Sequence, residues 1–122
     1  MTDTRTIHRF EEIDESLCLN FQEHLEIVGR KWTSGILLAG MRGARRFGEY
    51  RAHVVGISDR LLAQRFRELE AEGMVVRQVT PTSPVLVEYV LTERAVSLMG
   101  VLQPLVKWGI EHPRTAEQRE SA

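Results

Sequence analysis

The stretch GISDRLLAQRFRELEAEG, residues 56–73, decides the fold of this chain. With about 100° of rotation per residue, it predicts an amphipathic helix, because its large apolar residues gather on one side. That apolar side holds Leu61, Leu62, Phe66 and Leu69. The glutamates come only later in the stretch, so the opposite side is basic near its start, where it holds Arg60, Ala63, Gln64 and Arg67. We interpret this polar side as a surface suited to an anion.

Residues around this helix predict a helix-turn-helix. Ser58 can accept a hydrogen bond from the free amides of the first turn, and Gly73 is typical of the position that follows a helix end. Before it, RRFGEYRAHVVG places Phe47, Tyr50 and Val54 at helical spacing and closes at a glycine. Two short helices joined by the tight VVGIS turn are the pattern of a helix-turn-helix.

The rest of the chain supplies a wing and flanking helices. The valine-rich segments MVVRQVT and VLVEYVLT, separated by PTSP, predict the two short strands of a hairpin. From His24, the run HLEIVGRKWTSGILLAGMRG predicts one core helix despite its internal Gly29 and Gly35. A last helix is predicted from Thr92, and Pro104 should kink it or start a new segment. The predicted fold class is therefore mainly α with a small β-hairpin, a winged helix-turn-helix.

We expect one winged-helix domain over residues 15–112, with dimerisation helices at its two ends. Residues 1–14 are expected to be a flexible N-terminal segment or the start of a dimerisation helix, and residues 113–122 a disordered tail without an apolar face. Near the N-terminus, apolar residues recur every three or four positions, as one face of a helix requires. A chain this short has little else to cover them, which favours a homodimer. They are Ile7, Phe10, Ile13 and Leu17.

Composition excludes several classes of protein. No run approaches the roughly 18 apolar residues of a membrane span, and the first residues lack an apolar signal core, so we expect a cytoplasmic protein with no membrane contact. The single cysteine, Cys18, cannot form an internal disulfide. The four histidines show no metal-ligand spacing, and no catalytic motif is present. We therefore expect no cofactor, no metal site and no enzymatic activity.

Basic residues are concentrated in the middle of the chain, although the net charge is only −1. Residues 30–67 hold nine basic and two acidic side chains, whereas the segments on either side are acidic on balance. A local basic region is typical of contact with phosphates, and a solvated arginine-rich surface is the alternative interpretation.

The polar side of the central helix provides candidate base-reading residues. Arg60, Gln64 and Arg67 are spaced at i, i+4 and i+7, so all three can reach one groove of a duplex. Arginine can bind guanine and glutamine can bind adenine, each through two hydrogen bonds. The alternative for Arg67 is an intrahelical pair with Glu70.

Other residues of the basic region are candidates for phosphate contact. Arg46 and Arg51 flank the second predicted helix, and Ser58 begins the third. Free amides and the helix dipole favour anions at such helix starts. Arg65 lies near the apolar side, so its stem should pack while its head reaches a phosphate or a glutamate.

Several motifs, in their order and spacing, resemble those of the HxlR-type winged-helix transcriptional regulators, which are relatives of the MarR group. They are Cys18 ahead of GRKWT, then ILLAGMRGARRFGEY, GIS with LLAQRFRELEAEGMVVR, VEYVLT, and Trp108-Gly109. The resemblance implies a homodimer that holds double-stranded operator DNA with the helix after GIS. It also implies that the two copies are joined through their N-terminal and C-terminal helices.

The wing departs from the pattern of this family. Family members tend to have a proline and a basic residue before VEY, where this chain has Val85 and Leu86. A basic wing tip is therefore missing. Hydroxyl groups of the tip can still donate weaker hydrogen bonds to phosphates, and Thr82 is our candidate for this contact.

Two interpretations of Cys18 stay open. A reactive thiolate needs a nearby positive charge, and the neighbours from Glu15 to Leu19 offer none, which favours an inert apolar cysteine. The resemblance implies the second interpretation, because some family members sense oxidants or electrophiles through the matching cysteine.

The sequence thus predicts a homodimeric, sequence-specific DNA-binding transcriptional regulator. It would place the helix of residues 58–72 in the major groove of a pseudo-palindromic operator and respond to oxidants or electrophiles through Cys18. Two alternatives stay open. One is a winged-helix module that binds a protein partner, and the other is a dimer that responds to a small apolar effector at its cleft.

Overall fold

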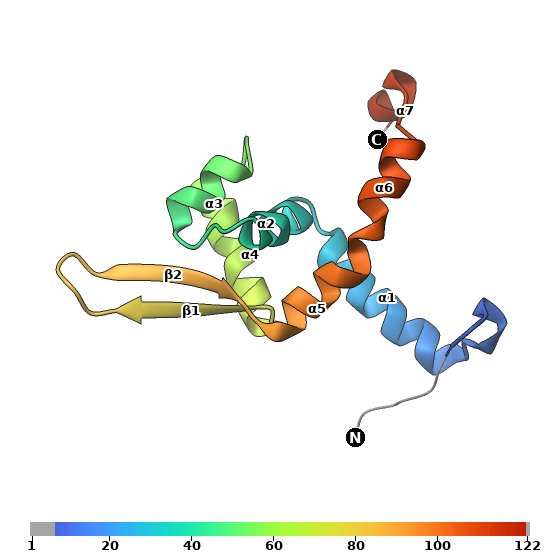
Figure 1. Ribbon diagram of the computed structural model, residues 1–122, viewed down its shortest axis with the longest axis horizontal. Helices are drawn as coiled ribbons and strands as arrows, with labels where there is room; N and C mark the ends of the chain where they lie inside the picture. Colours follow the sequence, from blue (N-terminus) through green and yellow to red (C-terminus); the bar gives the residue numbers. More distant parts are fainter. Residues whose placement is uncertain (1–6, 122) are drawn as a thin grey trace. The chain divides into compact units, whose positions relative to one another are not determined.

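The computed structural model describes residues 7–121 (Figure 1), so residues 1–6 of the predicted N-terminal segment lie outside the described part. The chain divides into two compact units, one up to Ser34 and one from Gly35. The first unit contains η1 (Phe10–Glu12) and α1 (Glu15–Gly29), and α2 (Thr33–Met41) begins in it and continues into the second. The other elements of the second unit are α3 (Phe47–His53), α4 (Asp59–Ala71), β1 (Val75–Thr80), β2 (Leu86–Leu91), α5 (Glu93–Leu102), α6 (Pro104–Glu111) and α7 (Ala116–Glu120).

The first element in the described part of the chain is a 3-10 turn rather than an α-helix. The side chain of Asp14 caps α1, where it accepts a hydrogen bond from the backbone N–H of Leu17 at 2.9 Å. The sequence predicts a helical face that starts before this cap. That prediction is wrong for its first three residues, Ile7, Phe10 and Ile13.

The run that begins HLEIVG forms parts of two helices, and the prediction of one continuous core helix is wrong. α1 ends at Gly29, Arg30 is extended, and α2 starts at Thr33. Between them, Trp32 has a φ of 79°, which lies far from the α-helical value. A bulky residue rarely adopts this left-handed conformation, and the chain cannot continue as one helix through it.

α3 and α4 form the predicted helix-turn-helix. The side-chain oxygen of Ser58 caps α4 as predicted, accepting a hydrogen bond from the N–H of Leu61 at 3.1 Å. Gly56 in the turn has a φ of 96°, which glycine adopts without a steric cost. α4 ends at Ala71, and Gly73 follows the C-cap residue with a φ of 71°, the position that the sequence predicts for it. The backbone N–H groups of Gly73 and Met74 close the last turn with hydrogen bonds of 3.1 and 2.8 Å.

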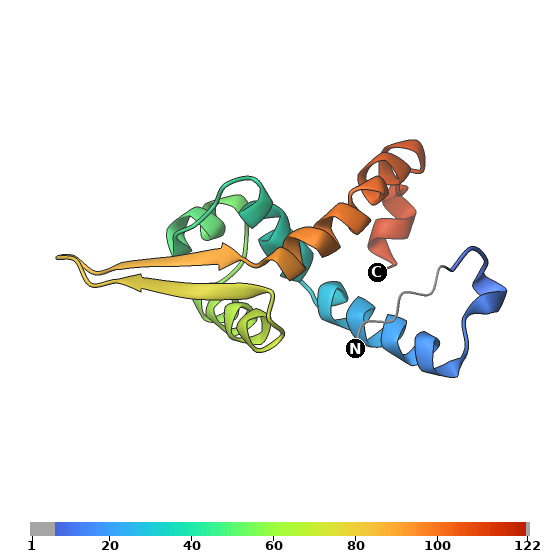
Figure 2. The same ribbon diagram turned by 60° about the horizontal axis from the view of Figure 1, so that its bottom comes forward.

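The wing is the antiparallel hairpin of β1 and β2, as the sequence predicts. Its register pairs Val75 with Leu91 at the base. There the N–H of Thr92 donates to the carbonyl of Met74 at 3.0 Å, so the two ends of the hairpin are held together. The strands project beyond α3 and α4 as one ribbon (Figure 2).

The core of the second unit takes residues from α2, α3, α4 and the base of the hairpin. Its large, fully buried side chains are Ile36, Leu37, Tyr50, Leu62, Phe66, Leu69 and Met74. The predicted apolar side of α4 is therefore confirmed, although Leu61 is only half-buried. Burial of each such side chain stabilises the folded state by about 1.5–3 kcal/mol. Because the apolar side of α4 faces the core, its polar side faces the solvent.

Three helices follow the wing. Thr92 caps α5, and Pro104 starts α6 as a new segment, both as predicted. α7 lies in the segment where the sequence predicts a disordered tail, so this expectation is corrected. Thr115 and Gln118 cap α7 reciprocally, with side chain to backbone distances of 3.1 and 2.8 Å. This pattern is the capping box that often begins a helix.

Candidate nucleic-acid interface

The polar side of α4 is open to solvent. Arg60, Gln64 and Arg67 are all exposed. Within the described part of the chain, the side chains of Arg60 and Arg67 have neither a hydrogen bond nor an ion pair, so the alternative pair of Arg67 with Glu70 is not formed. Gln64 donates through Nε2 to Oε1 of Glu68 at 3.3 Å. The three predicted base-reading side chains thus lie together on one exposed face.

Arg65 points to a glutamate. Its Nη1 lies 3.0 Å from Oε1 and 3.2 Å from Oε2 of Glu68. The two side chains are only 15 and 27 % exposed. Of the two roles that the sequence predicts for Arg65, the structure shows the contact with a glutamate, which orders the side of α4 next to the base-reading face.

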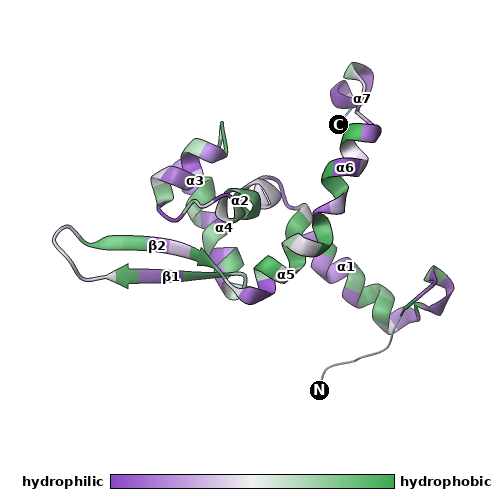
Figure 3. Ribbon diagram, in the orientation of Figure 1, coloured by the Kyte–Doolittle hydropathy of each residue, from purple (hydrophilic) through white to green (hydrophobic). Residues whose placement is uncertain are grey.

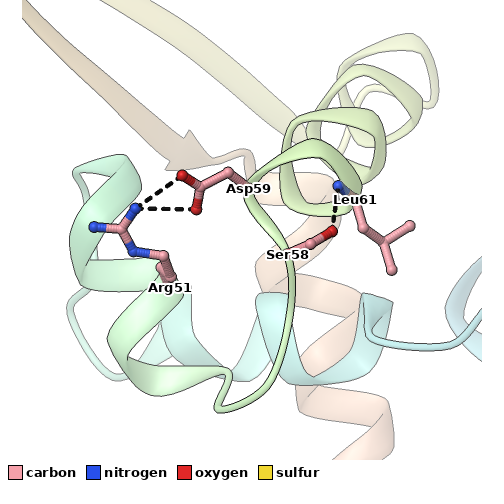
Figure 4. Close-up of polar contacts among 4 residues, drawn as sticks. All are labelled: Arg51, Ser58, Asp59 and Leu61. Atoms are coloured by element: carbon pink, nitrogen blue, oxygen red, sulfur yellow. Dashed lines mark hydrogen bonds and ion pairs between the residues drawn. The ribbon is translucent and has the colours of Figure 1, made fainter.

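The start of α4 is tied to α3 by an ion pair (Figure 4). Nη1 of Arg51 lies 3.0 Å from Oδ1 and 3.1 Å from Oδ2 of Asp59. Asp59 is the first residue of α4, directly after the capping residue Ser58. The structure thus pairs Arg51, a predicted phosphate contact, with a carboxylate for which the sequence predicts no role.

The start of α3 binds a carboxylate of its own. Oε1 of Glu49 accepts hydrogen bonds from the backbone N–H groups of Arg46 at 2.9 Å and Arg45 at 3.0 Å. The bond from Arg46, and then that from Arg45, hold the pKa of Glu49 below its ordinary value of 4.5. These two amides, which the sequence predicts for a phosphate, are therefore occupied, whereas the side chain of Arg46 is exposed.

Two of the predicted contact residues, Arg46 and Thr82, line one shallow groove between the start of α3 and the wing tip. The other residues along this groove are Phe47, Gly48, Pro84, Val85, Leu86 and Val87. The hydroxyl of Thr82 donates to the carbonyl of Pro84 at 2.8 Å. Because a hydroxyl has a single hydrogen, Thr82 must break this bond to donate to a phosphate.

An aromatic cluster attaches the wing to both helices of the helix-turn-helix. Its wing residue, Tyr89, is not among the residues predicted from the sequence. The rings of Phe66 in α4 and Tyr89 in β2 are stacked, with centroids 3.9 Å apart. Tyr50 of α3 meets Phe66 edge-on and donates through its hydroxyl to the carbonyl of Tyr89 at 2.8 Å. The N–H of Tyr89 in turn donates to the carbonyl of Arg45 at 2.7 Å. The sequence signal for this cluster was the aromatic character of positions 50 and 89.

Cys18 lies in α1 with an exposed side chain. Its Sγ accepts a hydrogen bond from Nε2 of Gln22 at 3.3 Å. The thiol is therefore accessible to small reagents in this structure.

Among residues 7–121, no three or more His, Cys, Asp or Glu side chains are grouped so that they could hold a metal ion. None of the described helices combines the length and the apolar character that crossing a membrane requires.

The helix-turn-helix, its exposed basic face and the attached hairpin define a winged helix-turn-helix protein. Comparison with protein families narrows this class. The HxlR-like helix-turn-helix family model matches residues 27–117, and the chain belongs to this family.

Relatives and solved structures agree with this assignment. The chain is 36% identical over 95 residues to the HTH-type transcriptional regulator YvaP of Bacillus subtilis (strain 168), covering 78% of this chain and 88% of YvaP. It is 36% identical over 93 residues to the HTH-type transcriptional regulator YodB of the same strain, covering 76% and 83%. The crystal structure of diamide-treated YodB matches with a TM-score of 0.69 at 34% identity, over 80% of this chain and 97% of that one. The redox regulator HypR in its reduced form matches with a TM-score of 0.70 at 34% identity, over 75% and 91%.

The family and these relatives show that the chain is a transcriptional regulator of the helix-turn-helix type and not an enzyme. The family, the fold class and the general function predicted from the sequence are thereby confirmed.

Proposed function

We propose that two copies of this chain bind a pseudo-palindromic operator, each placing α4 in the major groove. The observation that carries the proposal is the exposed face of Arg60, Gln64 and Arg67. A major groove admits one helix and displays a different set of donors and acceptors for each base pair. The side chains of Arg60 and Arg67 form no ion pair in the described part of the chain and suit guanine edges, and the amide of Gln64 suits an adenine edge.

Contacts to the DNA backbone would come from residues around this helix. Arg46 and Thr82 approach from the groove beside the wing, and Ser58 from the start of α4. Such contacts fix the register of a protein on a duplex but carry no sequence information. Arg65 would assist these contacts indirectly, because its ion pair with Glu68 partly neutralises a carboxylate on the same helix.

The homodimer is supported by apolar surface on the terminal helices. Val101, Leu105 and Ile110 are 73, 60 and 75 % exposed, and α1 also exposes Leu19 and Phe21. Figure 3 shows hydrophobic stretches on α1, α5 and α6. Exposed apolar side chains gathered on helices favour contact with another protein surface, so we assign these faces to contact with a second copy.

A redox response through Cys18 is the second part of the proposal. The thiol is exposed, and two structures similar to this one are of the diamide-treated YodB and the redox regulator HypR. Because each chain has a single cysteine, diamide would join the Cys18 thiols of two copies in a disulfide and take up their two hydrogen atoms. This bond would change α1, the helix that we assign to the dimer contact.

Selection of bound sequences from a pool of random duplexes, with and without diamide, tests both parts. We expect the untreated protein to enrich a palindrome and the treated protein to lose it, while the Cys18→Ser variant keeps it under both conditions. Enrichment of a single half-site would contradict the dimer, and loss of binding by the diamide-treated Cys18→Ser variant would contradict the role of the cysteine.

A protein partner is the second candidate, and the wing favours it. Val79 and Val85 are 49 and 59 % exposed near a tip that carries no basic residue. A titration with salt distinguishes the two candidates. Binding through several phosphates weakens steeply as salt rises, whereas docking through apolar side chains does not.

A further inference from the structure

Arg51 and Asp59 lie on different helices of the helix-turn-helix and are joined by a specific geometry. A single nitrogen, Nη1 of Arg51, lies 3.0 and 3.1 Å from the two carboxylate oxygens of Asp59 (Figure 4). The side chains are 52 and 64 % exposed. An exposed ion pair of this kind adds little to folding stability, so stability alone gives no reason for it.

The position of Asp59 makes its charge important for DNA binding. It is the only acidic residue between Glu49 and Glu68. It is also the first residue of α4, beside the proposed base reader Arg60. A carboxylate at this end of the helix would repel the phosphates that α4 must pass on entering a groove. Arg51 is the cation that the structure places against it.

We propose that Arg51 is a positioning residue, which holds and neutralises Asp59 at the DNA-facing end of α4 instead of binding a phosphate itself. Asp59 then acts as a specificity-determining residue, because it keeps Arg51 from binding a phosphate. Such a contact would raise the affinity equally for every DNA sequence. This inference rests on the proposed function, since it assumes that α4 enters DNA.

A double-mutant cycle tests the inference. The probes are the duplex enriched by the wild-type protein and a random-sequence duplex of equal length, each titrated with salt. We expect Arg51→Met to weaken binding to both duplexes about fivefold, because the charge of Asp59 is then uncompensated. We expect Asp59→Asn to strengthen binding to the random duplex about fivefold and to steepen the salt dependence by about one ion, because Arg51 is then free to reach a phosphate.

The double variant gives the decisive comparison. With Arg51→Met and Asp59→Asn together, binding to both duplexes should return to within about twofold of wild type, since both charges are gone. Arg51→Lys should also stay within about twofold, because only one nitrogen of Arg51 contacts the carboxylate. The unfolding temperatures of all four variants should stay within about 5 °C of wild type, since Asp59 contributes only a small interaction with the positive end of α4. This result separates the role from a folding role.

The opposite results overturn the inference. If Arg51→Met weakens binding equally with Asp or Asn at position 59, and lowers the salt dependence by about one ion in both backgrounds, Arg51 is itself a phosphate contact. A wild-type protein that enriches no duplex overturns the proposed function, and this role with it. The wild-type measurement alone therefore tells the two failures apart.

Discussion

Phe66 of α4 and Tyr89 of β2 are stacked with their ring centroids 3.9 Å apart and their planes 12° apart. This contact joins the helix that carries the proposed base readers to the wing. Since Tyr50 binds the backbone of the same strand, the orientation of the wing depends on three aromatic residues from three elements. Two of the three, Phe66 and Tyr50, are fully buried.

Removal of the ring of Tyr89 should destabilise the protein substantially. We expect Tyr89→Ala to lower the free energy of unfolding by about 2–4 kcal/mol, measured by denaturant titration, because the stack and its buried area are lost. Tyr89→Phe is the matched control. It should change the free energy of unfolding by less than about 0.5 kcal/mol, since the hydroxyl of Tyr89 has no hydrogen bond among the described residues. An equal loss in both variants would show that the ring stack is not the stabilising contact.

Two glycines of α2 should respond in opposite directions to the same substitution. A Cβ at Gly40 would lie 2.8 Å from Cγ of Leu91, whereas a Cβ at Gly35 would meet only Val54, at 3.7 Å. We expect Gly40→Ala to cost about 1–3 kcal/mol of stability through overpacking, and Gly35→Ala to be neutral or to gain up to about 1 kcal/mol through helix propensity. Thermal unfolding of the two variants measures the difference, and a stabilised Gly40→Ala would contradict the close packing of α2 on β2.

The hydroxyl of Thr33 is the source of a further prediction. Thr33 is buried, and its Oγ1 has no hydrogen-bond partner in the described part of the chain. A buried polar group without a partner is destabilising, so Thr33→Val should raise the free energy of unfolding by about 1 kcal/mol. Ser34→Val, at the exposed neighbouring position, should have an effect within about 0.5 kcal/mol. A loss of stability in Thr33→Val would mean that the hydroxyl is satisfied.

Stability at acid pH should depend on Glu49. Its pKa is lowered in the folded chain by the hydrogen bonds from Arg46 and Arg45, so the folded state favours the charged carboxylate. This contribution is present above the ordinary pKa of 4.5 and is lost as the pH falls through the lower folded value. The free energy of unfolding of the wild type, measured from about pH 6 down to about pH 3, should therefore fall more than that of Glu49→Gln. Parallel curves for the two proteins would contradict the role of this cap.

The elements that the sequence predicts well are those with local signals. α4 was predicted together with both its ends, because Ser58 and Gly73 mark them through hydrogen bonds and backbone conformation within a few residues. The break between α1 and α2 at Trp32 was not predicted, because the apolar stripe continues through it. The residue type gives no indication of a φ of 79°, since tryptophan rarely adopts it. The start of α7 has a local signal that was not used in the prediction, the threonine and glutamine of a capping box.

The candidate site was predicted less completely, because its pairings are not local. Exposure of Arg60, Gln64 and Arg67 follows from the helical pattern alone. The pairing of Arg51 with Asp59 spans a turn between two helices and depends on how those helices pack. Tyr89 lies still farther along the chain from the helices that it contacts, so sequence spacing carries no information about its stack with Phe66.

The central claim is that the exposed side of α4 distinguishes one base pair from another, and a comparison of two duplexes tests it most directly. Binding of wild type, Arg67→Ala and the charge-matched control Arg119→Ala, whose residue lies exposed in α7, is measured on the enriched duplex and on a scrambled one. We predict that Arg67→Ala weakens binding to the enriched duplex by roughly tenfold or more and changes binding to the scrambled duplex little, while Arg119→Ala leaves both unchanged. An equal loss on both duplexes in Arg67→Ala would contradict the claim.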